Sequence, residues 1–214
     1  MRAGLLIDLN DCIGCAACVM ACKVENGTQH GTYWANVFFK ETGNYPDVKR
    51  LALPSCCMHC QNAPCFKHCP TGATYYDEQG AVRVNSDACI GCRACINACP
   101  YHARHYNFTN PKDNPAYGAF GPDLSGKATG LTPFEIAKAH NHPAGTTGKC
   151  TLCAERRARN EIPACVEACP TKARLYGDLD DPNSEISIAI SKRQAYQLHA
   201  HLGTNPSVYY VGNF

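Results

Sequence analysis

The feature that most constrains this chain is a set of closely spaced cysteines that recurs four times. One run, starting at Cys89, has the form Cys-x2-Cys-x2-Cys-x3-Cys-Pro. In bacterial ferredoxins the first three thiolates of such a run hold one iron–sulfur cluster, while the fourth reaches a neighbouring cluster. The sequence therefore predicts metal clusters rather than a disulfide scaffold.

Three further runs follow the same pattern. The run from Cys12 has the same spacing, with Lys23 in place of the proline; the run from Cys57 has the form Cys-x2-Cys-x4-Cys-x3-Cys-Pro, and the run from Cys150 has the form Cys-x2-Cys-x11-Cys-x3-Cys-Pro. The candidate cofactor ligands are Cys12, Cys15, Cys18, Cys22, Cys57, Cys60, Cys65, Cys69, Cys89, Cys92, Cys95, Cys99, Cys150, Cys153, Cys165 and Cys169.

The order of the runs predicts how they pair. The two middle runs are adjacent and form one two-cluster unit, so the two outer runs pair with each other across the chain. The expected fold is α+β, with one ferredoxin-like 2×(4Fe-4S) unit nested inside another. If the fourth cysteine is exchanged within each pair, there are four ligand sets: Cys12, Cys15, Cys18 and Cys169 (set 1); Cys57, Cys60, Cys65 and Cys99 (set 2); Cys89, Cys92, Cys95 and Cys69 (set 3); Cys150, Cys153, Cys165 and Cys22 (set 4).

One of the 17 cysteines remains outside these sets. Only Cys57 gives the two-residue gap to Cys60 that the other runs share, so Cys56 is the spare. A spare thiol is either reactive or a small buried apolar residue, and the position beside a cluster loop favours the second interpretation.

Charge and composition exclude other classes of protein. The formal charge of +2 treats cysteines as neutral, but metal-bound thiolates are deprotonated. Four oxidised clusters of about −2 each bring the total to roughly −6, which removes the basis for nucleic-acid binding. Aliphatic residues are sparse, so we expect metal binding to supply folding free energy that a thin core does not.

The N-terminal stretch Met1–Asp8 has too few apolar residues for a secretory signal or a membrane span. No later stretch reaches eighteen apolar residues. We expect a chain without a direct membrane span that is made and loaded with clusters in the cytoplasm. Its final place, cytoplasmic or periplasmic, is in a membrane-associated complex, and export would depend on a partner's signal.

The runs and the composition between them predict four regions. The outer unit comprises residues 1–55 plus 149–180, the inner unit 56–109, a Pro/Gly-rich insertion 110–148, and a C-terminal helix and strand 181–214. Expected elements are strands at 4–9, 33–39, 50–53, 103–106, 173–176 and near 203–211, helices at 17–25 and 181–192, and a hairpin at 73–84. The insertion carries a helix signature from Thr132 and is interpreted as a docking surface rather than a floppy loop.

Other polar and aromatic residues carry weaker signals. His59, His68 and His102 lie in or beside cysteine runs, where they either tune a cluster or, as we favour, form ordinary hydrogen bonds. Trp34 is interpreted as a packing residue rather than an electron relay. No Ser-His-Asp arrangement, nucleotide loop or His-Glu-x-x-His motif is present, so we expect no catalytic residue on this chain.

The alternative for any Cys-x2-Cys pair is a zinc knuckle. Structural zinc sites take four ligands as two pairs and have no use for Cys-x2-Cys-x2-Cys-x3-Cys-Pro. Iron–sulfur clusters are therefore the favoured cofactor.

The order of the four runs also carries a family resemblance. The segments 57–65, 163–170 and 177–182 resemble the iron–sulfur (beta) subunit of the DMSO-reductase-type complex iron–sulfur molybdoenzymes, and residues 1–26 are similar to its polysulfide, thiosulfate and respiratory arsenate reductase branch. The likeness covers nearly the whole chain except residues 110–148.

That resemblance implies a chain with four 4Fe-4S clusters. It would pass single electrons between a large molybdopterin-dependent (molybdenum or tungsten) catalytic subunit and a membrane anchor, quinol-reacting subunit or cytochrome in anaerobic respiration. Because all sixteen ligand positions are cysteine, no 3Fe-4S centre is expected. Two alternatives stay open: a subunit of a soluble molybdenum or tungsten oxidoreductase, and a free polyferredoxin.

Overall fold

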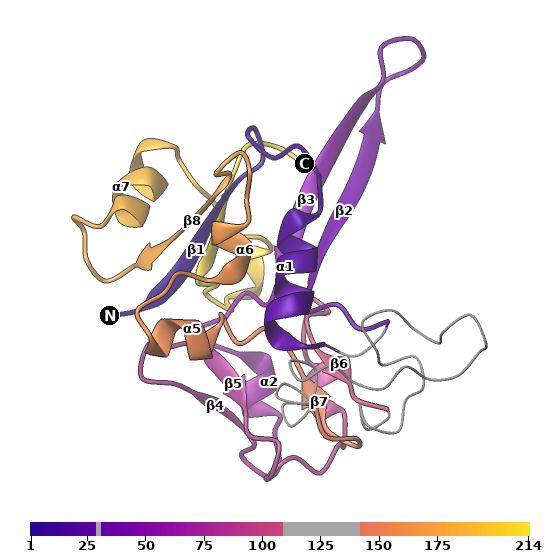
Figure 1. Ribbon diagram of the computed structural model, residues 1–214, viewed down its shortest axis with the longest axis vertical. Coiled ribbons are helices and arrows are strands. Elements are labelled where there is room, and N and C mark those ends of the chain that lie inside the picture. The colour runs from indigo at the N-terminus through magenta and orange to yellow at the C-terminus, as the bar shows by residue number, and fades with distance from the viewer. Residues whose placement is uncertain (29–30, 109–141) are drawn as a thin grey trace.

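A three-stranded sheet brings the first and last described strands together. The computed structural model describes residues 1–28, 31–108 and 142–214. Strand β1 (Ala3–Asp8) lies between β8 (Arg174–Asp178), which is antiparallel to it, and β9 (Val208–Val211), which is parallel (Figure 1). All six residues of β1 are buried, as expected of a central apolar strand with neighbours on both sides.

Helix α7 (Glu185–Lys192) covers this sheet and contacts β1 and β8. The packing is close: a Cβ on Gly177 would lie 2.8 Å from Ile186 Cγ2. The helix begins later than predicted. Ser184, not Asp181, is the N-cap, and its side chain accepts a hydrogen bond from the Ser187 N–H group.

The first and last cysteine runs meet beside the sheet. Helix α1 (Ala17–Asn26) carries Cys18 and Cys22, the last two cysteines of the first run, and contacts α6 (Ala164–Glu167), which lies within the last run. The predicted end of α1 is confirmed, since Gly27 caps the helix in the left-handed conformation with φ of 56°. Helix α5 (Ala154–Ala158) lies earlier in the last run.

The long hairpin of β2 (Ala35–Thr42) and β3 (Lys49–Cys56) extends away from the rest of the molecule (Figure 1). The predicted strands are present and are longer than expected. Several large apolar side chains on the hairpin are exposed, among them Phe38, Phe39, Tyr45 and Val48.

The middle cysteine runs form a small region of their own. Helices α2 (Pro64–Lys67) and α3 (Ala94–Asn97) contact each other, and β4 (Thr74–Tyr76) pairs with β5 (Val82–Val84) as the predicted hairpin. Strand β6 (His105–Tyr106) pairs with β7 (Thr147–Gly148). Residues 147 and 148, at the end of the predicted insertion, are thus packed here. The helix predicted from Thr132 lies outside the described residues.

Cysteines make up a large part of the main buried cluster. Cys22, Cys57, Cys60, Cys65 and Cys150 lie in it beside side chains such as Leu5, Met58 and Tyr210.

A single turn of 3-10 helix, η2 (Ala200–Leu202), precedes β9. In the part of the chain that the structure describes, no helix is long and apolar enough to cross a membrane.

Candidate iron–sulfur cluster sites

The four cysteine loops share one unusual backbone conformation. The residue before the second cysteine of each run is left-handed: Gly14, His59, Gly91 and Leu152 have φ of 69°, 44°, 67° and 53°. This conformation costs a non-glycine residue roughly 1 kcal/mol. The loops therefore adopt the same turn even where the sequence supplies histidine or leucine.

The turn directs backbone N–H groups at sulfur. The Leu152 N–H donates to Cys150 Sγ at 3.3 Å, and the His59 N–H donates to Cys57 Sγ at 3.5 Å. Beyond the second run, the Thr74 N–H donates to Cys69 Sγ at 3.4 Å. Burial alone would raise the pKa of Cys69, but hydrogen bonds from Thr74 and Thr71 outweigh it and lower the pKa. Such donors favour thiolate over thiol.

The members of set 1 surround one cavity. Cys12, Cys15 and Cys18, from the loop between β1 and α1 and the first turn of α1, line it together with Cys169, which follows α6. The cavity encloses about 350 Å³, counting its open mouth. Arg174 also lines it.

The members of set 3 surround a second cavity. Cys89, Cys92 and Cys95 line it with Cys69, and it encloses about 300 Å³, counting its mouth. The Oγ1 atom of Thr147 lies 3.7 Å from Cys89 Sγ and 3.6 Å from Cys95 Sγ. Strand β7 therefore contacts this site although it is far away in sequence.

The members of set 2 act on one another electrostatically. Burial is the main cause that raises the pKa of Cys60 to about 12, and the neighbouring Cys57, Cys65 and Cys99 act in the same direction. Burial and these neighbours therefore favour the thiol form of Cys60. A cationic metal core reverses that preference, because thiolates bind metal in the deprotonated form.

Cys22 of set 4 shows the same effect of burial. Burial raises the pKa of Cys22 well above its usual value, and Cys150, Cys165 and Cys153 add to the effect. The structure thus places the members of all four predicted sets beside one another. Cys15 and Cys92 are the two members exposed to solvent.

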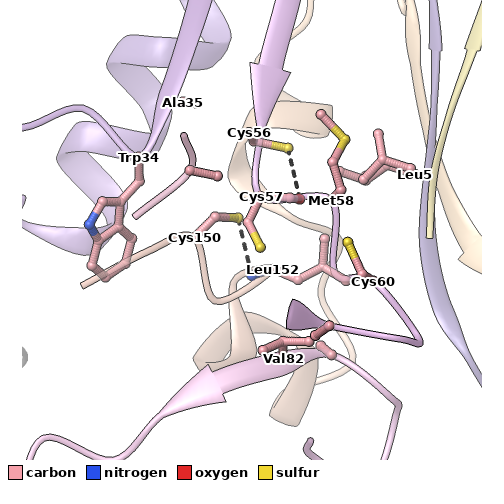
Figure 2. Close-up of a cluster of buried hydrophobic side chains, with 14 of the residues drawn as sticks. Leu5, Trp34, Ala35, Cys56, Cys57, Met58, Cys60, Val82, Cys150 and Leu152 are labelled. Carbon is pink, nitrogen blue, oxygen red and sulfur yellow. Dashed lines mark hydrogen bonds between the residues drawn. The ribbon is translucent and has the colours of Figure 1, made fainter. Parts of the chain in front are cut away.

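Cys56 is buried against two of these sites. Its Sγ donates to the Cys57 carbonyl oxygen at 3.5 Å (Figure 2). A hydrogen bond to Cys150, followed by burial, raises the pKa of Cys56, and the same bond lowers the pKa of Cys150. The pKa shifts of these two neighbouring thiols therefore run in opposite directions, upward for Cys56 and downward for Cys150.

The histidines and Trp34 have different surroundings. His59 is buried, and its pKa falls to about 4 through burial and then the charge of Lys149. His68 and His102 are exposed. Trp34 is buried and packs edge-on against His142, with ring centroids 5.0 Å apart, which is a packing contact.

Two buried arginines bear on whether these sites suit an anionic, sulfur-rich group. Arg104 and Arg174 are 4% and 3% exposed, and most of their guanidinium nitrogens have no hydrogen-bond acceptor among the described residues. A buried charge without a partner is costly. Clusters ligated by four thiolates would supply both negative charge and sulfur acceptors, so the residues present fit such a group.

Sequence reasoning missed these cations. The equal spacing of Ala103-Arg104 and Ala173-Arg174 after Pro100 and Pro170 was a signal, but it predicts only strands. No local pattern marks Lys149 as buried. Among residues 1–28, 31–108 and 142–214, no three His, Cys, Asp or Glu side chains converge closely enough to hold a single metal ion.

Two family models match the chain. A 4Fe-4S dicluster domain matches residues 48–113 and 125–179, and a 4Fe-4S binding domain matches residues 9–28. The first model covers both middle runs and the last run, while the second covers the first run.

Curated relatives match over nearly the full chain. The chain is 42% identical to the arsenate respiratory reductase iron-sulfur subunit ArrB of Shewanella sp. (strain ANA-3), with 100% of this chain and 97% of the relative covered. It is 35% identical to a selenate reductase subunit of Mesobacillus selenatarsenatis (97% and 70% covered) and 34% identical to a tetrathionate reductase subunit of Salmonella typhimurium (99% and 72% covered).

Proposed function

Because the chain belongs to the family of iron–sulfur subunits of molybdoenzyme complexes, electron-transfer proteins with 4Fe-4S domains, we propose that it holds four 4Fe-4S clusters, one on each of sets 1 to 4. When bound, such a cluster accepts and returns one electron at a time. The observation that carries the proposal is that each set, assembled from two separate runs, lies together in the fold.

The fourth-cysteine exchange is part of this proposal. Cys169 lines the cavity of set 1, and Cys69 lines the cavity of set 3. In the same way Cys22 lies with the first three cysteines of the last run, and Cys99 with those of the second run. In this proposal, the fourth cysteine of each run is a ligand to the cluster whose other three ligands come from the partner run.

We propose that electrons pass through the clusters of sets 1, 4, 2 and 3 in that order or in the reverse order. Helices α1 and α6 bring sets 1 and 4 together. Cys57 of set 2 and Cys150 of set 4 lie close enough for the charge of one to affect the other. Sets 2 and 3 share the middle runs. The chain's own residues would thereby line one path from end to end.

The nested domain division is proposed with it: an outer unit of residues 1–55 plus 149–180, an inner unit of 56–109 and a C-terminal extension of 181–214. The pairing of β1 with β8 supports the outer unit, because it joins residues from both of its segments. The β6–β7 pair supports a refinement, in which residues 147–148 also contact the inner unit.

For partners, we propose a large molybdopterin-dependent catalytic subunit and a membrane anchor or cytochrome, in a membrane-associated complex of anaerobic respiration. The exposed apolar side chains of the β2–β3 hairpin, Phe38, Phe39, Tyr45 and Val48, support a protein partner at that arm. Relatives of similar identity are named for arsenate, selenate and tetrathionate reductases. We therefore propose that the catalytic subunit, and not this chain, determines the substrate.

The test is anaerobic isolation of the native complex, with elemental analysis per mole of this chain. About sixteen irons, from four clusters of four, with molybdenum or tungsten on a co-purifying large subunit, is the expected result. About eight irons, or zinc in place of iron, would contradict the four-cluster proposal. Iron on a chain that purifies alone would favour the free polyferredoxin, and a complex without quinol activity or a need for detergent would favour the soluble oxidoreductase.

A further inference from the structure

We propose that three buried cations, Arg174, Lys149 and Arg104, each occupy one junction between successive sets and raise the reduction potentials of the two clusters on either side. This inference rests on the proposed function, because it requires clusters on all four sets. It adds a role for residues that bind no metal themselves.

Arg174 lies at the junction of sets 1 and 4. It is 3% exposed, lines the cavity of set 1, and interacts electrostatically with Cys18 of set 1 and Cys165 of set 4. Its Nη1 and Nη2 atoms have no hydrogen-bond acceptor among the described residues. Both terminal nitrogens are therefore available to sulfur.

Arg104 has the corresponding position in the middle of the chain, between sets 2 and 3. It is 4% exposed and interacts electrostatically with Cys65 and Cys57 of set 2 and with Cys95 of set 3. All three of its guanidinium nitrogens lack an acceptor in the described part of the chain. Each arginine follows the last cysteine of its run by five residues, so the two positions are equivalent by repeat.

Lys149 lies at the remaining junction, between sets 4 and 2. It is 2% exposed, and its charge acts on Cys57 of set 2 and on Cys150 of set 4. The Nζ atom donates to the Cys150 carbonyl oxygen at 2.6 Å and to the Val82 carbonyl oxygen. These contacts fix the ammonium group between the last run and the middle region.

Two other arginines nearby, Arg157 and Arg156, are paired with carboxylates. Arg157 donates to Asp77 at 2.7 Å, and Arg156 donates to Glu167. The structure records no carboxylate partner for Arg104, Arg174 or Lys149 within residues 1–28, 31–108 and 142–214. Among the described residues, the potential negative charges beside these cations are thiols and, for Arg174, also the Tyr210 hydroxyl, which indicates that these cations are placed for the clusters.

The electrostatic consequence follows from charge alone. A cluster gains one negative charge on reduction, so a fixed cation in a low-dielectric junction stabilises the reduced form more than the oxidised form. The same cation attracts both neighbours when both are reduced and so offsets part of their mutual repulsion. In transfer across a junction, one cluster loses the electron that the next gains, and the protonation of the cation is unchanged.

The experiment uses the native complex carrying Arg104→Gln, Arg174→Gln or Lys149→Met. Iron per chain is measured first, and an anaerobic redox titration followed by electron paramagnetic resonance then resolves the four one-electron steps. Each variant should hold as much iron as the wild type and move two steps to lower potential. The reduced-to-oxidised ratio of those clusters at a fixed potential should fall about tenfold, equivalent to 59 mV for a one-electron couple.

The pattern of shifts is the decisive readout. The two steps that move in Arg104→Gln should differ from the two that move in Arg174→Gln, and Lys149→Met should share one step with each. Full iron with unchanged potentials, or the same two steps moving in both arginine variants, would overturn the inference. The exposed Arg159, paired with Glu161, provides the control, because Arg159→Gln should move no step.

Charge-conserving variants separate charge from shape. Arg104→Lys, Arg174→Lys and Lys149→Arg should keep iron and wild-type potentials. If a neutral variant loses iron but its charge-conserving counterpart retains iron, the result supports the inference. If both variants lose iron, the side chain has a packing role and the inference is overturned. A wild-type chain with far fewer than sixteen irons would instead refute the four-cluster proposal, so the two failures are distinguishable.

Discussion

Arg157 and Asp77 form a 2.7 Å ion pair between α5 and the turn that joins β4 to β5. Their side chains are 4% and 15% exposed. Asp77 also accepts the Gln79 and Ala81 N–H groups, at 3.0 and 2.9 Å. One carboxylate thus closes the β4–β5 turn and attaches it to the last cysteine run.

Replacing Asp77 with Asn should destabilise the folded chain by about 3 kcal/mol, because removal of one partner leaves a buried charge uncompensated. The free energy of unfolding by urea, followed through cluster absorbance under anaerobic conditions, measures the loss. Arg159→Gln is the control, since it breaks only an exposed pair with Glu161 and should leave the midpoint unchanged. Equal effects of the two changes would contradict the importance of burial.

The same ion pair should also give a pH dependence. Burial raises the pKa of Asp77, but Arg157 and the backbone donors outweigh it and lower the pKa below its usual value. The stabilisation is therefore present above the unfolded pKa of about 4 and is lost as the pH falls through the lower folded pKa. The difference in unfolding free energy between wild type and Asp77→Asn should be constant near neutral pH and shrink in acid. A difference that grows in acid would refute this assignment.

Gly91→Ala should disrupt set 3. Gly91 has φ of 67°, and a Cβ there would lie 2.0 Å from the Gly145 carbonyl oxygen, so backbone must move. Gly72 has the same φ of 67° with nothing within 4 Å of its Cβ position. Gly72→Ala should therefore cost only about 1 kcal/mol of conformational strain and keep full iron, whereas Gly91→Ala should lose about one cluster's worth, four irons. Iron analysis distinguishes the two.

Cys56 and Cys57 offer a matched pair of neighbouring cysteines. Cys56→Ala should keep about sixteen irons, because this side chain lies outside the four proposed sets and donates to the Cys57 carbonyl oxygen. Cys57→Ala should reduce the content to about twelve irons, or to about fifteen if a 3Fe-4S centre forms. Iron loss from Cys56→Ala with retention in Cys57→Ala would reverse the assignment of the spare cysteine.

The four cysteine runs could be recognised because ligand spacing is a local, covalent property of the sequence, while their division into four ligand sets stays a prediction. Strand β1 could be predicted because it is an apolar run. The start of α7 could not. Asp181 followed by Pro182 is typical of a helix start, but the Asp181 side chain accepts the Asn183 N–H group at 2.9 Å, which leaves Ser184 as the cap.

Long-range contacts account for the other differences. Thr147 lies in a Pro/Gly-rich stretch that predicts no strand. In the structure it belongs to β7 and pairs with Tyr106 of β6. Arg104 and Lys149 are ordinary surface residues by composition. Their burial depends on which segments surround them, and a sequence pattern that repeats locally carries no information about those segments.

The sheet order also limits how the protein can be made. Leu5 of β1 pairs with Val208 of β9 and with Tyr176 of β8, so the first strand emerges from the ribosome long before either partner has been synthesised. Likewise Cys12, Cys15 and Cys18 are synthesised long before Cys169, which lines the same cavity. The middle runs, 57 to 99, are complete much earlier. During translation the N-terminal strand therefore stays without its two pairing partners until nearly the whole chain has been synthesised, whereas the cysteines of the middle runs are all present well before that point.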